Sequence, residues 1–365
     1  MAAVSGATIP DGLSPIIRTT KALRSVAQEH RLLLLIAALY VACCLGLLAT
    51  VPDDTLENLA IDFPVSLLGN LVIVASVAGL FTIGFLARRR PPDPIRTVAR
   101  HVARPDIWPL ILSRGLILVT MTALVMSVFA GMKGSIPFFR PFAFDPAFVA
   151  IDAALHGGSQ PWTWIQPWLG HPRITSALDR AYYLWFPVVF HTYYWQVFTV
   201  RNPRLRYQFL MAFMLCWMLI GTLAAIALSS AGPVFLAKMG LDDLPFRELL
   251  SYLASVDRTR SLMAVTVQES LWQVYATGAD MPLRGISAMP SMHIAIAVLM
   301  AIFGWRKHWA LGLAYSLFAL LIFLGSVQLA FHYAVDGYVA AVMVGIIWWF
   351  AGRVARREVP LENPA

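Results

Sequence analysis

Residues 309–350 read WALGLAYSLFALLIFLGSVQLAFHYAVDGYVAAVMVGIIWWF, and this stretch decides the fold class. It contains two apolar runs, 309–329 and 332–350, each close to the roughly 20 residues that an α-helix needs to cross the hydrocarbon core of a bilayer. A polar motif at the junction of the two runs carries His332 and Asp336. The stretch therefore predicts two transmembrane helices, with ionisable side chains where the second one begins.

The rest of the chain repeats this apolar pattern. Of its 365 residues, 59% are hydrophobic and only 13% are charged, whereas about 25% of the residues of a soluble domain are charged. Further apolar runs lie at about 32–51, 64–86, 115–131, 181–200, 209–229 and 291–306. We therefore expect an all-α protein, a polytopic membrane helix bundle with about eight transmembrane helices.

Basic residues lie in alternate loops between these runs. The segment 87–104, ARRRPPDPIRTVARHVAR, is the most basic of them, and its prolines prevent one continuous helix. Because such loops stay in the cytoplasm, we expect a multi-pass protein of the cell inner membrane with both termini cytoplasmic. The basic residues of these loops also account for the net charge of +8. Since no basic groove with interleaved aromatic residues is evident, we expect no nucleic acid partner.

This topology predicts four segments. Residues 1–31 form a cytoplasmic N-terminal segment, and residues 32–107 form an accessory transmembrane hairpin with the basic cytoplasmic loop. Residues 108–352 form the catalytic membrane domain, and residues 353–365 form a cytoplasmic tail.

Three polar segments stand at the outer ends of predicted spans. They are Lys133 to Pro141, Ser287 to His293 and Phe331 to Gly337. The topology, deduced from loop charge alone, puts all three on the side that faces the periplasm or the exterior. Ionisable residues near or within a bilayer are costly and tend to be functional, so we expect the site there.

The pair of His332 and Asp336 has the spacing i, i+4, which puts both residues on one face of a helix. A carboxylate that accepts a hydrogen bond from one imidazole nitrogen leaves the other nitrogen free as a nucleophile. We also expect the first-turn amides of this helix to favour an anionic phosphate. The alternative interpretation is a buried histidine held by an aspartate for structural reasons.

Other residues of the three segments fit the same chemistry. Ser291 can cap a helix and hold phosphate oxygens, and His293, one turn further on, can protonate a leaving alkoxide. Lys133, Arg140 and Arg284 can neutralise phosphate charge. The alternative is a capping serine, an incidental histidine and ordinary basic residues of the membrane interface.

Together the segments resemble the signature of the type-2 phosphatidic acid phosphatase superfamily, which is K-x6-R-P, then P-S-G-H, then S-R-x5-H-x3-D. The matching residues are Lys133, Arg140 and Pro141 in the first element, Pro290, Ser291 and His293 in the second, and His332 and Asp336 in the third. The forms SAMPSMH and HYAVDG are similar to its inositolphosphotransferase branch, which includes inositol phosphorylceramide synthases. The chain departs from the pattern at Met292, which replaces a glycine, and at Gly325 and Ser326, which replace the Ser-Arg pair.

The resemblance implies a six-helix core and a reaction that needs no metal or other cofactor. It implies a phosphohistidine intermediate on His332, oriented by Asp336. His293 would act as the general acid for the leaving group and then as the base for the acceptor.

We therefore expect a membrane enzyme that hydrolyses or transfers a lipid-linked phosphate ester at the outer membrane face. Its substrate would be a phospholipid or a polyprenyl phosphate, and the acceptor would be water or an alcohol such as inositol, a sugar or a lipid hydroxyl. The alternative is a lipid transporter or binding scaffold that retains the fold without catalysis. Polar residues at helix ends, rather than at mid-membrane depth, favour the enzyme.

Overall fold

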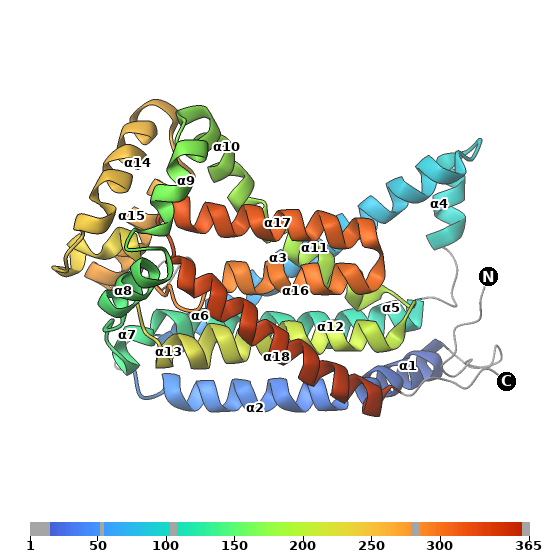
Figure 1. Ribbon diagram of the computed structural model, residues 1–365. Coiled ribbons are helices and arrows are strands. Elements are labelled where there is room, and N and C mark those ends of the chain that lie inside the picture. The colour runs from blue at the N-terminus through green and yellow to red at the C-terminus, as the bar shows by residue number, and fades with distance from the viewer. Residues whose placement is uncertain (1–14, 52–54, 103–107, 279–284, 360–365) are drawn as a thin grey trace.

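The computed structural model describes residues 15–51, 55–102, 108–278 and 285–359 (Figure 1). Within these ranges the chain forms helices joined by turns and loops, and it contains no β-strand. The prediction of an all-α helix bundle is therefore confirmed.

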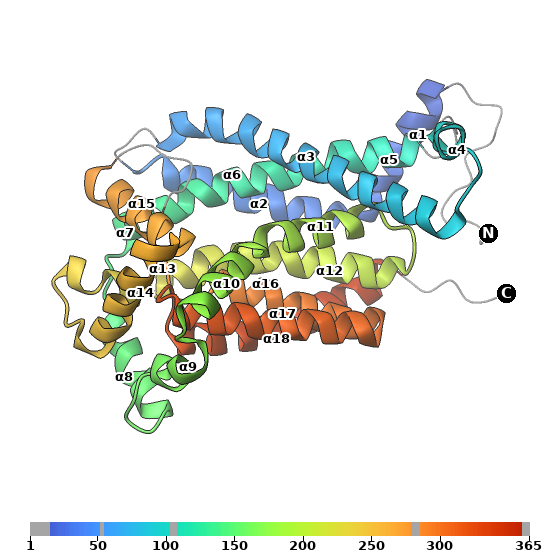
Figure 2. The same ribbon diagram turned by 90° about the horizontal axis from the view of Figure 1, so that it is seen from above.

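Six helical stretches in the described residues are long and apolar enough to cross a membrane. They are α2 (Arg31–Leu48), α3 (Thr55–Arg89), α5 to α6 (Trp108–Gly134), α12 to α13 (Pro203–Ala227), α17 (Trp309–Gln328) and α18 (Ala334–Glu358). Figures 1 and 2 show that these helices lie side by side along a common direction. Two of the stretches contain a π-helical segment, η1 (Gly115–Val119) and η2 (Cys216–Ala224).

The two remaining predicted spans are short. The run at 181–200 contains α11 (Trp185–Phe198), with 14 residues, and the run at 291–306 corresponds to α16 (Met292–Lys307), with 16 residues, close to its predicted length. At 1.5 Å per residue such helices reach about 21 and 24 Å, less than the roughly 30 Å of a hydrocarbon core. Both run beside the longer helices, and α16 packs against α17 and α18 (Figure 1).

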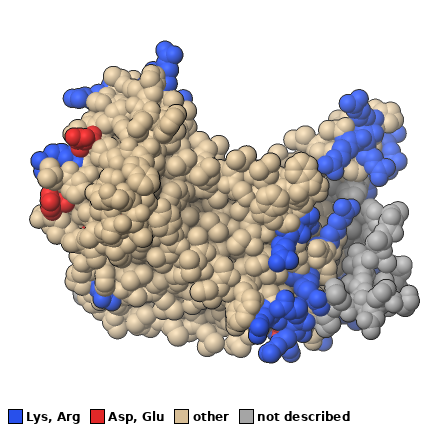
Figure 3. Space-filling model, viewed as in Figure 1, with Lys and Arg blue, Asp and Glu red and all other residues tan. Residues whose placement is uncertain are grey.

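The helix α12 occupies the centre of the bundle, and residues 209–214 within it are completely buried. By contrast, α3 lies at the edge and exposes side chains such as Leu68 and Leu80. Figure 3 shows a middle band on this face without lysine, arginine, aspartate or glutamate, while these residues gather at the two ends. This distribution suits a bundle whose sides are covered by lipid.

A group of short helices covers the end of the bundle at which α16 and α18 begin (Figure 1). They are α7 (Ile136–Phe139), α8 (Asp145–Leu155), α9 (Pro161–Leu169), α10 (Pro172–Tyr183), η3 (Pro233–Phe235), η4 (Ala237–Met239), η5 (Leu244–Phe246), α14 (Arg247–Arg260) and α15 (Met263–Thr277). All three polar segments singled out in the sequence lie at this end, which we call the histidine end.

The opposite end carries the basic loops and is called the arginine end. Here lie α1 (Pro15–Glu29), α4 (Pro94–Val102), the beginnings of α2 and α12, and the end of α18. Lysine and arginine side chains cluster over this end in Figure 3. The helix α3 stops at Arg89, directly before the prolines, as the sequence predicts.

The structure differs from the sequence pattern at three places. The helix α3 begins before the apolar run at 64–86, so that Glu57 and Asp62 lie within it, and Glu57 is in its first turn, where the helix dipole favours a carboxylate. The last helix does not end near Phe350 but continues to Glu358. Arg114, which directly precedes the apolar run at 115–131, is only 7% exposed.

Candidate active site

The turn that carries His332 joins the end of α17 to the start of α18. The backbone N–H groups of Phe331 and His332 both donate to the carbonyl oxygen of Ser326, at 3.0 and 3.1 Å. Ala330 adopts the left-handed conformation, with φ of +57°. The chain therefore reverses within a few residues, and His332 precedes α18. The predicted arrangement, in which His332 and Asp336 share one face of a helix, does not occur.

His332 and Asp336 nevertheless lie in contact. Nδ1 of His332 is 3.1 Å from Oδ2 of Asp336 and 2.9 Å from the carbonyl oxygen of Ala288. Because a carbonyl oxygen only accepts, Nδ1 carries the proton and Nε2 keeps its lone pair. The same Oδ2 accepts the N–H of Tyr333 at 3.1 Å, and Oδ1 has no partner among the described residues.

Asp152 occupies the helix terminus that we expected to hold phosphate. Its carboxylate accepts the N–H groups of Ala334 and Val335, at 2.7 and 2.9 Å. With Tyr333 bonded to Asp336, the first amides of α18 already have acceptors, so the expectation that they bind phosphate is wrong. Burial raises the pKa of Asp152, and the two backbone hydrogen bonds act in the opposite direction.

Asp145 is a second buried aspartate that the sequence analysis missed. It accepts the N–H groups of Ala231 and Gly232, at 2.9 and 2.8 Å, and the hydroxyl of Tyr333 at 2.9 Å. Asp145 and Asp152 are seven residues apart in α8, which puts them on one face of that helix. Two aspartates at this spacing in an otherwise apolar helix are the signal that could have revealed them.

Ser291 is the N-cap of α16 and is completely buried. Its hydroxyl oxygen accepts the N–H of Ile294 at 3.4 Å, and its own N–H donates to the carbonyl oxygen of Asp336 at 3.3 Å. Ser291 thus caps the helix that carries His293 and joins that helix to α18.

The imidazole of His293 is surrounded by aromatic rings from α10 and α11. Tyr182 stacks on it with ring centres 5.0 Å apart, and Trp185 lies at 4.5 Å. Nε1 of Trp185 also donates to the carbonyl oxygen of His293 at 2.8 Å, and Phe186 meets the imidazole edge-on at 6.0 Å. These contacts restrict the orientation of His293.

The structure brings the two histidines together. The ring centres of His293 and His332 are 6.3 Å apart, with 56° between the ring planes. A phosphoryl group can be bonded to a nitrogen of one imidazole and accept a hydrogen bond of about 2.6–3.2 Å from the other imidazole at such a separation. One phosphoryl group can therefore contact both rings.

The loop after α13 connects the second and third segments. The carbonyl oxygen of Ser230 accepts the N–H of Ala288 at 2.9 Å, and its hydroxyl accepts the N–H of Met289 at 3.1 Å. Gly232 has φ of +105°, and a Cβ there would lie 2.7 Å from the carbonyl oxygen of Phe331. Only glycine allows the loop to pack so closely against the turn that carries His332.

Lys133 reaches the same site from α6. Gly285 has φ of +84°, and a Cβ there would lie 2.3 Å from the carbonyl oxygen of Lys133, so the backbone just before the second segment packs closely against the first segment. Lys133 is close enough to His293 for its charge to act on that imidazole.

Arg140 lies away from the histidine pair in the structure. Arg140 is exposed, and its guanidinium lies over the ring of Phe144, 4.7 Å from the ring centre. Its carbonyl oxygen accepts the hydroxyl of Ser229 at 2.9 Å. Arg284 lies outside the described residues.

The positions that depart from the family signature have other partners. Ser326 occupies the position at which the family signature has an arginine. Its hydroxyl donates to the hydroxyl oxygen of Tyr182 at 3.4 Å. The side chain of Met292 packs beside Gly221 in η2, where a Cβ would lie 3.1 Å from its sulfur. Of Lys133 and Arg140, the two described basic residues predicted to bind phosphate, Lys133 is the one whose charge acts on His293, whereas Arg140 is exposed.

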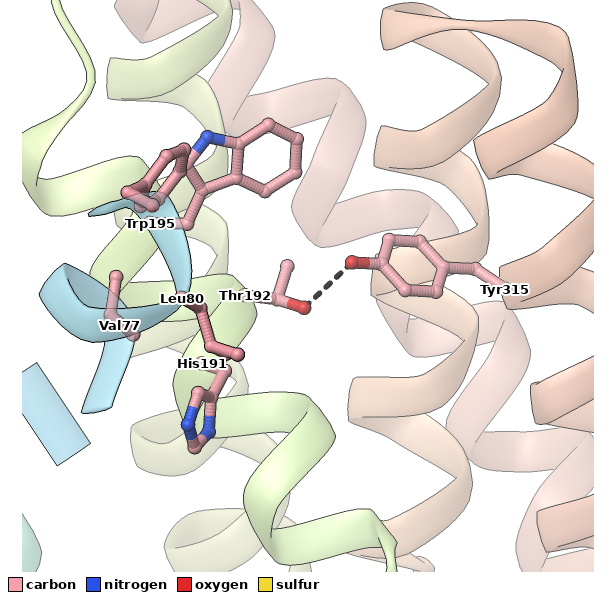
Figure 4. A pocket seen from close by; sticks show the side chains of 7 residues that line it. Val77, Leu80, His191, Thr192, Trp195 and Tyr315 are labelled. Atoms are coloured by element: carbon pink, nitrogen blue, oxygen red, sulfur yellow. Dashed lines mark hydrogen bonds between the residues drawn. The ribbon is translucent and has the colours of Figure 1, made fainter. Parts of the chain in front are cut away.

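A cavity of about 270 Å³ opens between α3, α11 and α17 (Figure 4). It is lined by Val77, Leu80, Phe81, His191, Thr192, Trp195 and Tyr315. Its polar groups already have partners, since the hydroxyls of Thr192 and Tyr315 are 2.7 Å apart and His191 bonds Ser76 at 2.9 Å. None of these residues belongs to the histidine site, so this cavity does not identify the reaction centre.

A comparison with protein-family models agrees with the geometry. The model of the PAP2 superfamily matches residues 146–350, more than half of the chain, and the match includes both histidines, Asp152 and Asp336. The search of curated proteins and the search of solved structures found no match. On the extent of the family match, the chain belongs to the PAP2 superfamily.

Proposed function

We propose that the protein is a membrane enzyme that cleaves or transfers a lipid phosphate ester through a phosphohistidine on His332. Membership of the PAP2 superfamily points to a phosphatase or phosphotransferase of lipid phosphates. The observation that carries the finer proposal is the arrangement of His332. Its Nδ1 donates to Ala288 and Asp336, and its Nε2 belongs to a ring 6.3 Å from that of His293.

In the first half-reaction Nε2 of His332 attacks the phosphorus atom. The bond between phosphorus and the lipid oxygen breaks, and the protonated imidazole of His293 gives its proton to the departing alkoxide. The N–P bond leaves a positive charge on the ring of His332, which still holds its proton on Nδ1. The carboxylate of Asp336 stabilises this charge at 3.1 Å.

In the second half-reaction His293, now neutral, removes a proton from water or an alcohol. The resulting oxygen nucleophile attacks the phosphorus atom, and the bond to Nε2 of His332 breaks. The products are inorganic phosphate when water attacks a monoester, or a new phosphate ester when an alcohol attacks. The ammonium of Lys133 neutralises phosphate charge in both steps, where other members of the family use an arginine.

Ser291, Arg140 and Arg284 have smaller parts in this proposal. Ser291 positions His293 by capping α16. Arg140, which is exposed, would attract anionic headgroups rather than contact the phosphorus centre. Arg284 stays a predicted phosphate ligand that lies outside the described residues. The lipid tail stays between the helices and the bilayer, and the histidine end faces the periplasm or the exterior of the inner membrane.

The test is to trap the intermediate. The purified protein is mixed with a ³²P-labelled lipid phosphate and quenched in alkali, and we expect a labelled protein whose label is stable to alkali and lost in acid. The variant His332→Asn keeps a donor near Ala288 but cannot form an N–P bond, so it should take up no label. The control is His171→Asn, an exposed N-cap of α10, which should label normally.

Unlabelled wild type, or full turnover by His332→Asn, would rule out the proposed nucleophile. The acceptor is then identified with the active enzyme. Free phosphate formed without added alcohol indicates a phosphatase, whereas a new headgroup-bearing lipid formed only with inositol, a sugar or a lipid alcohol indicates a transferase. A protein that binds lipid phosphate but releases no product with any acceptor would be the non-catalytic scaffold.

A further inference from the structure

Two arginines are buried at the arginine end, far from the proposed reaction. Arg206, in the first turn of α12, is 1% exposed, and Arg114, at the end of α5, is 7% exposed. Both form ion pairs with one carboxylate, that of Glu29 at the end of α1. Arg114 also donates from Nη1 to the carbonyl oxygen of Thr199 at 2.9 Å.

These bonds leave several donors without an acceptor. Nε of Arg114, and Nε and Nη1 of Arg206, are buried and have no hydrogen-bond partner among the described residues. A guanidinium has five N–H donors and does not lose its proton in a protein, so this deficit cannot be relieved by deprotonation. Buried polar groups normally have partners, and an unpaired buried charge is strongly unfavourable.

The other titratable group in contact does not supply the missing charge. His30 is completely buried, and its Nδ1 donates to the carbonyl oxygen of Val26 at 2.9 Å. Burial lowers the pKa of His30 to about 4, so the ring is neutral near pH 7. Among the described residues, two guanidiniums and one carboxylate therefore leave one net positive charge in the cluster.

One side of the cluster reaches the protein surface. The side chain of Glu29, the last residue of α1, is 27% exposed, whereas those of Arg114 and Arg206 are buried. The helix α1 is amphipathic, and it buries Ala22 and Val26 while it packs against α5. Such a helix lies in the plane of the lipid headgroups, which brings those headgroups beside Glu29.

We propose that Arg114 and Arg206 form a binding site for one phosphate-type anion, and that this anion is the phosphodiester of an anionic lipid. The oxygens of a phosphodiester match the unpaired N–H donors, since guanidinium binds phosphate through parallel hydrogen bonds. A phosphodiester carries one negative charge, which balances the one net positive charge of the cluster. Inorganic phosphate has the same oxygens, but it carries more charge near pH 7 and has no chains to hold it at the membrane.

The experiment measures the thermal unfolding midpoint of the purified full-length protein in a neutral detergent, after its lipids are removed. Phosphatidylglycerol, phosphatidylcholine and inorganic phosphate are added in separate series. We expect phosphatidylglycerol to raise the midpoint by several degrees, phosphatidylcholine to raise it much less, and inorganic phosphate to have little effect at equal concentration. Native mass spectrometry should find one retained phosphatidylglycerol per chain.

Matched variants locate the effect. Arg206→Gln should lose most of the shift, whereas Arg357→Gln, an exposed arginine of α18 at the same end, should keep it. Glu29→Gln removes the carboxylate that pairs with both arginines and should respond more strongly than wild type, which provides a test even if Arg206→Gln does not fold. A lipid held at the histidine end instead would give a shift that Arg206→Gln keeps, so the two ends are distinguished.

Equal shifts with phosphatidylglycerol and phosphatidylcholine, or an unchanged shift in Arg206→Gln, would overturn the proposal. A shift produced by inorganic phosphate alone would overturn the assignment to a lipid. Since none of these measurements uses turnover, they remain valid if the proposed phosphoryl transfer fails.

Discussion

The two ends of the bundle bury charge in opposite ways. At the histidine end, Asp145, Asp152 and Asp336 each accept at least two hydrogen bonds, mostly from backbone N–H groups. At the arginine end, Arg114 and Arg206 share one carboxylate, and three of their buried nitrogens have no acceptor among the described residues. The buried carboxylates of the histidine end thus have their hydrogen-bond donors within the protein. The buried arginines of the arginine end need the proposed anion to supply acceptors.

The difference has a physical origin in the backbone. Helix N-termini and irregular loops present free N–H groups, and these can solvate a buried carboxylate without bringing a second charge into the interior. The three carboxylates use such groups in α18 and in the loop around Gly232, and they thereby hold the turn of His332 from several sides. A nucleophile must be held in a fixed position. A site that binds a lipid phosphate needs hydrogen-bond donors that no protein group already uses.

The largest effect is expected for Asp336→Asn at the histidine end. The asparagine can still accept the N–H of Tyr333, but it cannot neutralise the positive ring of phosphorylated His332. By analogy with other catalytic histidine–aspartate pairs, we expect turnover to fall by about 10³- to 10⁴-fold. The measurement is the kcat for lipid phosphate, and a loss smaller than tenfold would show that the carboxylate only supports the fold.

The variant His293→Gln is expected to come next and separates acid catalysis from binding. General acid catalysis contributes about 10²- to 10⁴-fold for a poor leaving group. We therefore expect a loss of that size on an alkyl phosphate, and a loss of less than about tenfold on an aryl phosphate whose leaving group needs no proton. Equal losses on both substrates would contradict the acid role, and wild type measured on both provides the reference.

At the arginine end, Glu29→Gln leaves two buried cations without a counter-charge. Breaking such a pair costs about 3–5 kcal/mol, and we expect a loss of that order in the free energy of unfolding when no anionic lipid is present. Denaturant or thermal unfolding in neutral detergent measures it. An unchanged stability would mean that the arginines are hydrated, and the contrast between the two ends would disappear.

The smallest of these effects is expected for Asp152→Asn, which keeps one acceptor oxygen for the amides of α18. Loss of a charge-assisted hydrogen bond costs about 1–3 kcal/mol, less than at Glu29 because the amides of Ala334 and Val335 are neutral. Unfolding measurements on both variants under the same conditions test this order. A larger loss at Asp152 than at Glu29 would reverse our account of the two ends.

Much of the fold could be predicted from local sequence. The apolar runs predicted the long helices, and the prolines after Arg89 predicted where α3 ends. The motif around His332 and Asp336 predicted their contact, because residues so close in the chain meet in almost any helical start. These features depend on composition and on short spacing, which the sequence displays directly.

The remaining features depend on contacts between distant segments. Tyr333 bonds Asp145 across 188 positions, Ala334 bonds Asp152 across 182, and Arg206 pairs with Glu29 across 177. The spacing of the two aspartates within α8 could have drawn attention to them, but nothing in the sequence predicts their hydrogen-bond partners. The buried state of Arg114 was equally hidden, since a basic residue beside an apolar run resembles one at the membrane surface.

The sequence by itself determined that the chain forms a membrane helix bundle with histidines and acids near its helix ends. Hydrophobicity and short-range spacing are sufficient for that, because each helix in a membrane must satisfy its own backbone. Only the tertiary structure decided that the two imidazoles face each other and which buried charges have partners. Those outcomes depend on how helices pack, and packing joins residues whose distance along the chain carries no information about their distance in space.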